Sequence, residues 1–328
     1  MIEKFQHIIK EEVEKYSAQL PLHPAELYDP IRYVLALGGK KIRPLLTLLA
    51  CDLFNGNRED AIPAAIAIEL FHNFTLVHDD IMDNAPLRRS KPTVHSKWNS
   101  SIAILSGDVM LVKTYELLTK ASQKSHIVLD TFNEMAIKVC EGQQFDMNYE
   151  KANHIPVLHY FKMIEHKTAV LIAASLKIGA LIAGASNEDA ANIYEFGKYT
   201  GIAFQLQDDL LDIYGNEEKF GKQQGGDIIS NKKTFLLLKA IELSSLNAYK
   251  KEELAQWLSF VPVSEKDIQQ KVEGVKSIYD FTNVKKITEN EINICHQKAL
   301  VAFHKISASK EKKDMLINFT SSLLKRDV

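Results

Sequence analysis

The sequence predicts an all-α fold, and three observations support that class. Apolar residues recur at spacings of three and four along most of the chain, which is the period of a helix with a buried face. Only 14 glycines and 9 prolines interrupt the 328 residues, so the stretches between breaks are long. No sustained alternation of apolar and polar residues between hairpin turns is present, which argues against a sheet.

The apolar periodicity predicts eight helices, over residues 45–54, 62–83, 102–119, 127–148, 158–183, 188–214, 234–243 and 287–307. An amphipathic helix is expected at the N-terminus as well, and the more polar residues 245–285 are expected to form a peripheral helical excursion. The breaks fall at 38–39, 55–57, 84–93, 151–156, 184–187 and 215–226. None of them is a long low-complexity linker, so a single domain over 1–328 is predicted.

Composition and charge argue against several other classes of protein. The net charge is −2 and the basic residues are spread along the chain, so no nucleic-acid footprint is expected. Cys51, Cys140 and Cys295 lie far apart without CxxC spacing, which argues against a disulfide framework or a metal cage. The N-terminal residues have neither an apolar h-region nor the Arg- and Ser-rich character of a transit segment, so no targeting segment is expected. The most apolar stretch, 168–186, carries Lys177 in its middle, which is costly in a bilayer, so a cytoplasmic protein without a stable membrane span is predicted.

Two acidic triplets with the same spacing stand far apart in the chain. They are Asp79, Asp80 and Asp83, and Asp208, Asp209 and Asp212. Carboxylates four residues apart share one face of a helix and repel each other, so a compensating cation is expected. Hard oxygen ligands suit Mg²⁺, which shares its coordination shell with substrate phosphates. A single triplet is equally typical of a solvated helix end, but two copies beside basic and amide residues favour a metal–diphosphate site.

Basic segments accompany both triplets. Residues 38–43 form a glycine turn followed by three cations that can face an anion, although a basic helix start is commonly a surface feature. Arg88 and Arg89 follow the first triplet within one loop and predict a Mg²⁺–diphosphate clamp. Residues 220–234, rich in glycine and lysine, follow the second triplet without the Walker spacing.

Two further polar segments interrupt apolar helices. Lys167 and Thr168 are expected to open the apolar 168–186 helix, where free backbone N–H groups would assist an anion; a capping Thr beside an exposed Lys is the alternative. The segment 142–146, Gly-Gln-Gln-Phe-Asp, could orient a neighbouring cation or a metal-bound water, or form a surface amide cluster.

In their order these motifs resemble the trans-isoprenyl diphosphate synthase (polyprenyl synthetase) family. The match runs from Gly38 to Thr234 through GGKxxRP, a downstream His, DDxxD with RR, GQxxD, KT, FQxxDDxxD and GKxxGxDxxxxKxT. Asn231 is a minor departure, since many bacterial members carry Gly there. The resemblance implies an isoprenoid synthase-type helical bundle around a deep central cavity, usually as a homodimer. It also implies Mg²⁺-dependent head-to-tail condensation of isopentenyl diphosphate with a dimethylallyl, geranyl or farnesyl diphosphate, releasing pyrophosphate.

The resemblance further implies a role for each matching residue. Three Mg²⁺ would be held, two by Asp79, Asp80 and Asp83, and the third by Asp208, Asp209 and Asp212. Isopentenyl diphosphate would be bound by Lys40, Arg43, His72 and Arg89. The allylic diphosphate would be bound by Arg88, Lys167, Lys222 and Lys232. The catalytic residues nearest the reacting carbons would be Lys167, Thr168 and Gln205.

Aromatic residues before the first triplet predict the length of the product. Phe74 and Phe71 lie five and eight residues before Asp79, with the smaller Thr75 between Phe74 and the triplet. Large rings act as fixed plugs, so a short pocket and a C15–C20 product are expected, unless these rings only pack the core. A longer-chain synthase remains an alternative. A terpene cyclase would lack the second DDxxD and the second diphosphate site, and a regulatory subunit would tend to lose ligands that this chain keeps.

Overall fold

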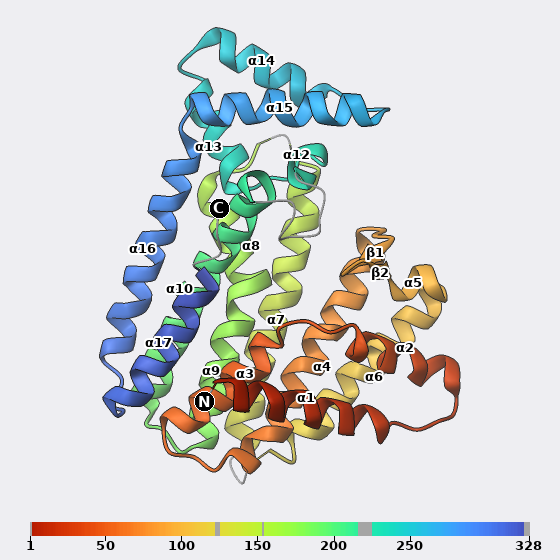
Figure 1. Ribbon diagram of the computed structural model, residues 1–328, viewed down its shortest axis with the longest axis vertical. Helices are drawn as coiled ribbons and strands as arrows, with labels where there is room; N and C mark the ends of the chain where they lie inside the picture. The colour runs from red at the N-terminus through yellow and green to blue at the C-terminus, as the bar shows by residue number, and fades with distance from the viewer. Residues whose placement is uncertain (1, 122–124, 153, 216–224, 325–328) are drawn as a thin grey trace. The chain divides into compact units, whose positions relative to one another are not determined.

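The computed structural model describes residues 2–121, 125–152, 154–215 and 225–324. Within these residues the regular structure is helical apart from one hairpin, made by strands β1 (Leu87–Arg88) and β2 (Lys91–Pro92) (Figure 1). The predicted all-α class is therefore confirmed. Contacts divide the chain into two compact units: unit 1 comprises 1–136, 171–195 and 305–319, and unit 2 comprises 137–170, 196–304 and 320–328. The single domain predicted over 1–328 stays a prediction.

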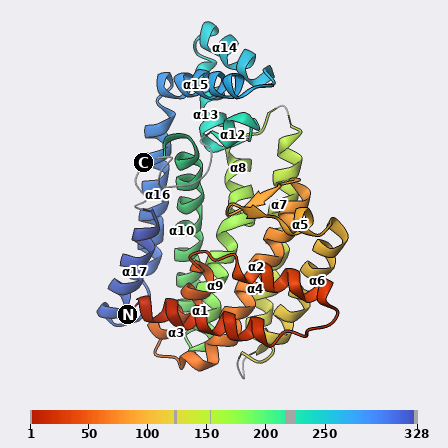
Figure 2. The ribbon, with the colours of Figure 1, turned by 45° about the vertical axis from the view of Figure 1, so that its right-hand side comes forward.

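Unit 1 is built on helix α4. Its elements are α1 (Ile2–Ala18), α2 (Ala25–Ala36), α3 (Ile42–Leu53), α4 (Arg58–Met82), α5 (Val94–Lys97), α6 (Ser100–Leu118), the first half of α7 (Ser125–Glu150), nearly all of α9 (Val170–Ile182), the start of α10 (Asn187–Tyr214) and most of α17 (Lys310–Leu324). Helix α4 packs against α1, α3 and α6 (Figures 1 and 2). Helix α9 approaches α3 closely because residue 179 is glycine: a Cβ there would lie 2.1 Å from the carbonyl oxygen of Thr47.

Helix α4 is also long and apolar. Among the described residues it is the helix whose length and composition would allow it to cross a bilayer, and 72% of the relevant stretch is buried inside the structure. The apolar stretch singled out in the sequence, 168–186, forms α9, whose residues Ala173, Ala174 and Leu176 are fully buried. That stretch is a core helix, as predicted.

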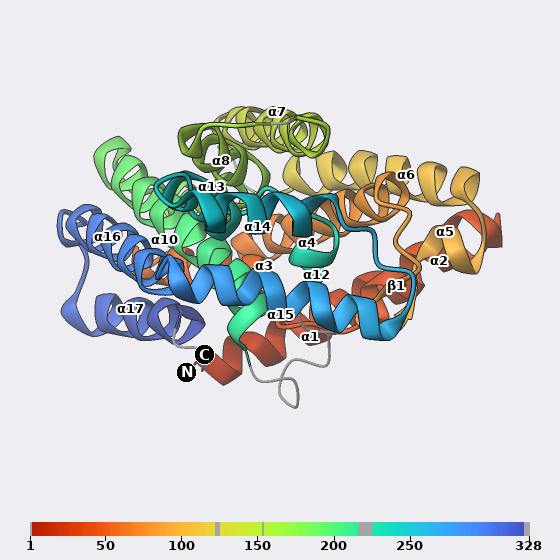
Figure 3. The same ribbon diagram turned by 90° about the horizontal axis from the view of Figure 1, so that it is seen from above.

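Unit 2 carries the second acidic triplet. Its elements are the second half of α7, α8 (Val157–Ile164), the π-helical turn η1 (Glu165–Ala169), the rest of α10, α12 (Gly226–Ile229), α13 (Phe235–Ser244), α14 (Ala248–Ser259), α15 (Glu265–Phe281) and α16 (Val284–His304). The apolar side chains of Leu206, Leu210, Leu236 and Ile278 form its core. The excursion expected over 245–285 is the pair α14 and α15, and α15 also packs against α12 (Figure 3).

Candidate functional site

The first acidic triplet lies at the end of α4, in unit 1. Asp80 is 3% exposed, and its Oδ1 accepts a hydrogen bond of 2.7 Å from Nε of Arg88. Nη2 of Arg88 lies 3.3 Å from Oδ2 of Asp79, while Asp83 is exposed and caps the helix. Burial raises the pKa of Asp80, and the positive charge of Arg88 opposes this shift. The charge of Arg88 thus offsets the crowded carboxylates, and the Mg²⁺ expected at this triplet stays a prediction.

Arg88 and Arg89 are held by a hairpin that occupies the break expected at 84–93. Arg89 and Ser90 have φ of 53° and 59°, so the turn between β1 and β2 has the left-handed backbone of a type I′ hairpin, which normally favours Asn and Gly. The guanidinium of Arg89 donates to the carbonyl oxygen of Gly38. A Cβ at Gly39 would lie 2.7 Å from that guanidinium, so glycine is needed for the approach.

The three cations of the turn at 38–43 have different surroundings. Lys40 is exposed and lines a cavity of about 470 Å³ beside α1. Lys41, which the motifs did not assign to a substrate, has its Nζ bonded at 3.1 Å to Glu69, which is 3% exposed. The backbone of Lys41 has a left-handed φ of 44°, so its side chain leaves the chain in a different direction from those of Lys40 and Arg43. Arg43 instead places Nη1 3.1 Å from Nε2 of His72.

The contact with Arg43 defines the state of His72. A guanidinium has no acceptor, so Nε2 of His72 must accept and the ring proton must sit on Nδ1. The pKa of His72 is held well below its ordinary value, first by burial of the ring and then by the charges of Arg43, Arg89, Arg88 and Lys41. His72 is therefore neutral near pH 7 and is surrounded by positive charge, which is an environment that favours an anion. Of the residues predicted to bind isopentenyl diphosphate, the structure brings Arg43, His72 and Arg89 together.

The depressed pKa of His72 has a consequence for stability. Below about pH 6.5 the unfolded chain takes up a proton at this ring and the native state does not, so stability falls with pH until the native pKa is reached. The maximum slope is about 1.4 kcal/mol per pH unit. In urea unfolding at about pH 7.5 and about pH 5.5, His72→Gln should lose less stability on acidification than wild type. Equal losses in the two proteins would contradict a native-state shift at His72.

The aromatic residues before the triplet lie in the core of unit 1. Phe71 is 1% exposed and packs edge-on against Phe132, with ring centroids 5.0 Å apart. Phe74 is 9% exposed and contacts both Phe71 and His78. The hydroxyl of Thr75 donates to the carbonyl oxygen of His72. The role of these residues as a floor for the product stays a prediction, and Phe74 is the more accessible of the two rings.

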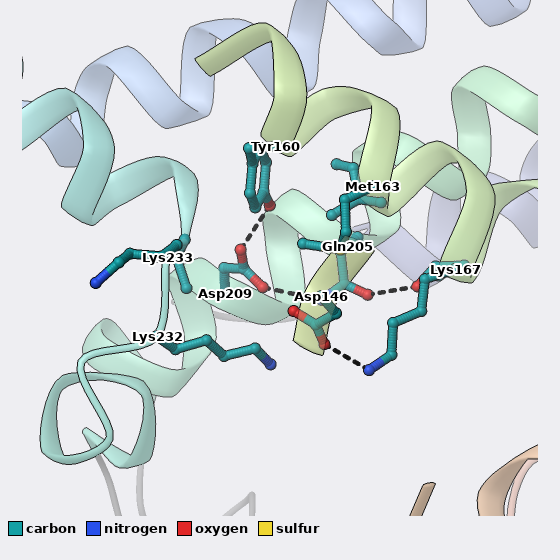
Figure 4. Close-up of a pocket in the computed structure, with 11 residues that line it drawn as sticks. Asp146, Tyr160, Met163, Lys167, Gln205, Asp209, Lys232 and Lys233 are labelled. Atoms are coloured by element: carbon teal, nitrogen blue, oxygen red, sulfur yellow. Dashed lines mark hydrogen bonds and ion pairs between the residues drawn. The ribbon is translucent and has the colours of Figure 1, made fainter. Parts of the chain in front are cut away.

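In unit 2 a chain of hydrogen bonds runs along a cavity of about 40 Å³ (Figure 4). Oγ1 of Thr168 donates to Oε1 of Gln205 at 2.9 Å, and Nε2 of Gln205 donates to Oδ1 of Asp209 at 2.9 Å. The hydroxyl of Tyr160 donates to the other oxygen of Asp209 at 2.6 Å. Lys167, Thr168, Gln205 and Lys232, all predicted from the sequence, line this cavity together with Asp209.

Lys167 and Thr168 do not open a helix, contrary to one expectation from the sequence. They lie in η1, a π-helical turn between α8 and α9, so the stretch 157–182 is helical throughout and offers no free N-terminal N–H groups at this point. Nζ of Lys167 is bonded at 2.6 Å to Asp146, the last residue of the GQxxD motif. Gly142 lets the two segments meet, because a Cβ there would lie 2.2 Å from the backbone nitrogen of Lys167. Single π turns inside α-helices are frequent at functional sites.

Asp209 is the buried member of the second triplet. Burial, and next the negative charge of Asp227, raise the pKa of Asp209 to about 7, against the opposing effects of Lys232, Tyr160 and Gln205. Both of its oxygens accept hydrogen bonds, so it fixes the orientation of Gln205 and Tyr160. Sequence reasoning missed Tyr160, because a tyrosine in an apolar helix carries no sign of its partner.

The segment after the second triplet folds back onto it. The backbone N–H of Asp227 donates to Oδ2 of Asp212 at 3.0 Å, and that of Gly225 donates to the Asp212 carbonyl oxygen at 2.8 Å. Lys232 lies 3.8 Å from Asp227, and its N–H donates to the Asp227 carbonyl oxygen. Asp227 was not assigned a role from the sequence. Lys222 lies outside the described residues.

The donor atoms of both triplets fit Mg²⁺. Within the part of the chain that the structure describes, no three His, Cys, Asp or Glu side chains are arranged to hold a metal by themselves. Mg²⁺ does not need such a cage, because it typically takes one or two carboxylates and completes its shell with water and substrate phosphates. Pairs of carboxylates beside Arg and Lys therefore define a class of site: one for diphosphate substrates bound with a divalent cation.

Comparison with known proteins agrees with this class. The family model for polyprenyl synthetase matches residues 24–275. Geranylgeranyl diphosphate synthase of Methanosarcina mazei is 43% identical over 222 residues, covering 67% of this chain and 68% of the relative. A crystal structure of a geranylgeranyl pyrophosphate synthase matches with a TM-score of 0.94 and 41% identity, covering 100% and 99% of the two chains. A synthase of the same name from Corynebacterium glutamicum, complexed with isoprenyl diphosphate and magnesium, matches with a TM-score of 0.88 and 25% identity over 99% of both chains.

The chain belongs to the polyprenyl synthetase family. It is a prenyltransferase that condenses isopentenyl diphosphate with an allylic diphosphate to give C15–C20 prenyl diphosphates. The structural match also confirms the isoprenoid synthase-type helical fold expected from the motifs.

Proposed function

We propose that the enzyme makes a C20 all-trans prenyl diphosphate, with three Mg²⁺ and with the residue roles implied by its motifs. The observation that carries the proposal is the group of cations around neutral His72 in the second half of α4. This group suits a diphosphate whose bond to carbon stays intact during the reaction, as that of isopentenyl diphosphate does in the condensation. The C20 length is supported by relatives named geranylgeranyl diphosphate synthase.

The first triplet and Arg88 serve the allylic diphosphate in this proposal. Arg88 compensates Asp79 and Asp80 while no substrate is bound, and its planar fork of donors matches a phosphate equally well. Two Mg²⁺ at Asp79 and Asp83 and a third at Asp208 would neutralise the charge that develops on the leaving pyrophosphate. The carboxylates thus exchange one cationic partner for another when the substrate binds.

The hydrogen-bonded chain in unit 2 serves the reacting carbons. Thr168 and Gln205 place a hydroxyl and an amide oxygen beside the cavity, where their dipoles stabilise an allylic cation. Asp209 and Tyr160 hold the amide of Gln205 in place. Lys167 and Lys232 bind the diphosphate that leaves, and that pyrophosphate is the proton acceptor in this proposal. The two carboxylates on the cavity are already engaged: Asp146 is bonded to Lys167, and Asp209 accepts from Tyr160 and Gln205.

A cytoplasmic homodimer completes the proposal. The exposed face of α6 carries Ile104, Leu105, Val112 and Tyr115, with exposed fractions of 45%, 57%, 67% and 38%. Apolar residues gathered on one face of a helix are typical of a subunit interface, and a second copy of the chain would cover them. All three cysteines are free thiols, as expected in a reducing compartment.

The proposal is tested by incubating the protein with Mg²⁺, labelled isopentenyl diphosphate and each allylic diphosphate in turn. A discrete C20 product on chromatography is expected, and none in the presence of a chelator. A C15 product would correct the chain length alone. Products of C30 or longer would place the floor of the pocket elsewhere, and release of a cyclic hydrocarbon would favour a terpene cyclase.

Phe74→Ala should lengthen the product to C25 or beyond. Phe74 lies just over one turn before the triplet, and its large ring is still 9% exposed. Its removal opens room for further isoprene units. The measurement is the product distribution at a fixed ratio of the two substrates. Phe281→Ala on α15, where the ring is 56% exposed, is the control and should leave the distribution unchanged. An unchanged distribution in Phe74→Ala would exclude this ring as the floor.

A further inference from the structure

Helix α15 of unit 2 contains a buried lysine that no motif accounts for. Lys271 is 1% exposed, although it lies in the polar stretch expected to be peripheral. Its ammonium donates to the carbonyl oxygen of Phe260 at 3.1 Å and to that of Ile229 at 3.3 Å. Among the described residues no carboxylate forms an ion pair with it. Burying an ammonium group costs free energy unless it is hydrogen-bonded, so the bonds to these two carbonyl oxygens stabilise Lys271 in its buried position.

Both acceptors lie where a helix ends. Ile229 is the last residue of α12, and Phe260 directly follows Ser259, the last residue of α14. The final carbonyl groups of a helix have no partner within it and carry partial negative charge, so a cation placed among them is stabilising. Lys271 therefore links the C-terminal ends of α12 and α14, and α15 supplies the link.

Two neighbouring contacts hold the same segment. Nδ2 of Asn231 donates to the carbonyl oxygen of Leu258, near the end of α14, at 2.8 Å. Asn231 has a φ of 53°, a left-handed conformation that Asn tolerates better than most residues. Gly225, just before α12, packs so closely on Val272 that a Cβ there would lie 2.7 Å from it. Residues 225–231 are thus fixed against α14 and α15 at three points.

The segment held in this way carries groups of the proposed site. Asp227 donates its N–H to Asp212, and Lys232 lies on the cavity and beside Asp227. We propose that Lys271 is a positioning residue for the allylic diphosphate: by joining α12 to α14 it fixes residues 225–234, and with them Lys232. This inference rests on the proposed role of Lys232 in binding that diphosphate.

The test is Lys271→Met, which keeps the length of the side chain and removes its charge and donors. The KM for farnesyl diphosphate should rise about tenfold, the size typical of losing a residue that orients a ligand-binding group. The KM for isopentenyl diphosphate should change by less than about twofold, since its proposed site lies in unit 1. Hydrogen exchange of the amides of 226–234 should become faster, while exchange in α4 should not change.

The matched control is Lys266→Met, which removes the same charge from an exposed position on the same helix and should leave every value unchanged. A Lys271→Met enzyme with the KM values and exchange rates of the control would overturn the proposal. An equal rise of both KM values would overturn it as well, because it would indicate a general structural role. The wild-type enzyme is measured in the same assay. If it condenses the two substrates, the proposed function holds, and the outcomes above then bear on the role of Lys271 alone.

A second variant covers the case in which Lys271→Met does not fold. Asn231→Gly removes the side-chain bond to Leu258 while glycine accepts the left-handed backbone. If the joint between 225–231 and α14 positions Lys232, this variant should also raise the KM for farnesyl diphosphate selectively, by about threefold, a little over half a kcal/mol. Unchanged KM values in this variant would overturn the proposal without any use of Lys271→Met.

Discussion

An Asp79→Ala enzyme should turn over about a thousandfold more slowly than wild type at saturating substrates, because Asp79 is a proposed ligand of the Mg²⁺ that neutralises the leaving pyrophosphate. Such neutralisation contributes several kcal/mol, and each 1.36 kcal/mol in the barrier is a factor of ten in rate. The fold should survive, since Arg88 keeps its 2.7 Å bond to Asp80 when Asp79 is removed. Helicity measured by circular dichroism should therefore equal that of wild type.

The measurement is the initial rate of incorporation of labelled isopentenyl diphosphate over a range of Mg²⁺ concentrations. Asp60→Ala is the matched control, since Asp60 is an exposed carboxylate in the first turn of α4 and has no proposed role. A near-normal rate for Asp79→Ala would remove this residue from the metal site. A loss of helicity along with the loss of rate would instead assign Asp79 a structural role through its contact with Arg88.

The end of α4 shows how much of the site is predictable from sequence. Three carboxylates within about one helical turn favour a nearby cation, and one of the two arginines in the loop that follows supplies it. The structure pairs Arg88 with Asp79 and Asp80. This part of the site is local in sequence, so its chemistry follows from residue type and spacing. The helices themselves were predictable for the same reason, since their apolar period is a local property.

The turn at 38–43 shows where that reasoning ends. Three cations lie within four residues, and their spacing alone does not predict which of them points into the protein and pairs with a buried carboxylate. The answer depends on the left-handed backbone of Lys41 and on Glu69, a carboxylate buried in the middle of α4. Glu69 is far from Lys41 in sequence and lies among apolar residues. Its pairing with Lys41 therefore follows only from the packing of α3 against α4.

The π turn at 165–169 escaped prediction for a different reason. The turn is a short polar segment between two apolar helical runs, and residue types alone do not show whether the backbone there widens within one helix or starts a new one. The polar pair Lys167 and Thr168 therefore resembled a helix start. Lys271 was missed for the opposite reason: it stands in a polar stretch, where a lysine normally lies in solvent. Its burial depends on two helix ends, those of α12 and α14, that meet beside α15 only in the folded chain.

The second large effect is expected at the other diphosphate. Arg43→Met should raise the KM for isopentenyl diphosphate about thirtyfold, because a hydrogen bond to a charged group contributes about 1.5–3 kcal/mol and Met keeps only the apolar part of the side chain. The KM for the allylic diphosphate should stay within about twofold of wild type. Arg58→Met, at the start of α4, removes the same charge elsewhere in unit 1 and serves as the control. Equal increases in both KM values would argue against a site for isopentenyl diphosphate at Arg43.

A second readout of Arg43→Met does not depend on turnover. Of the neighbouring charges that lower the pKa of His72, Arg43 has the largest effect, so this pKa should rise in the variant, as measured by NMR of the imidazole resonances. Arg58→Met should leave it unchanged. If Arg43 and His72 bind the substrate as one unit, the double variant Arg43→Met/His72→Gln should cost less in KM than the sum of the single variants. Strict additivity would mean that the 3.1 Å contact between them is incidental to binding, and that each side chain meets the diphosphate independently.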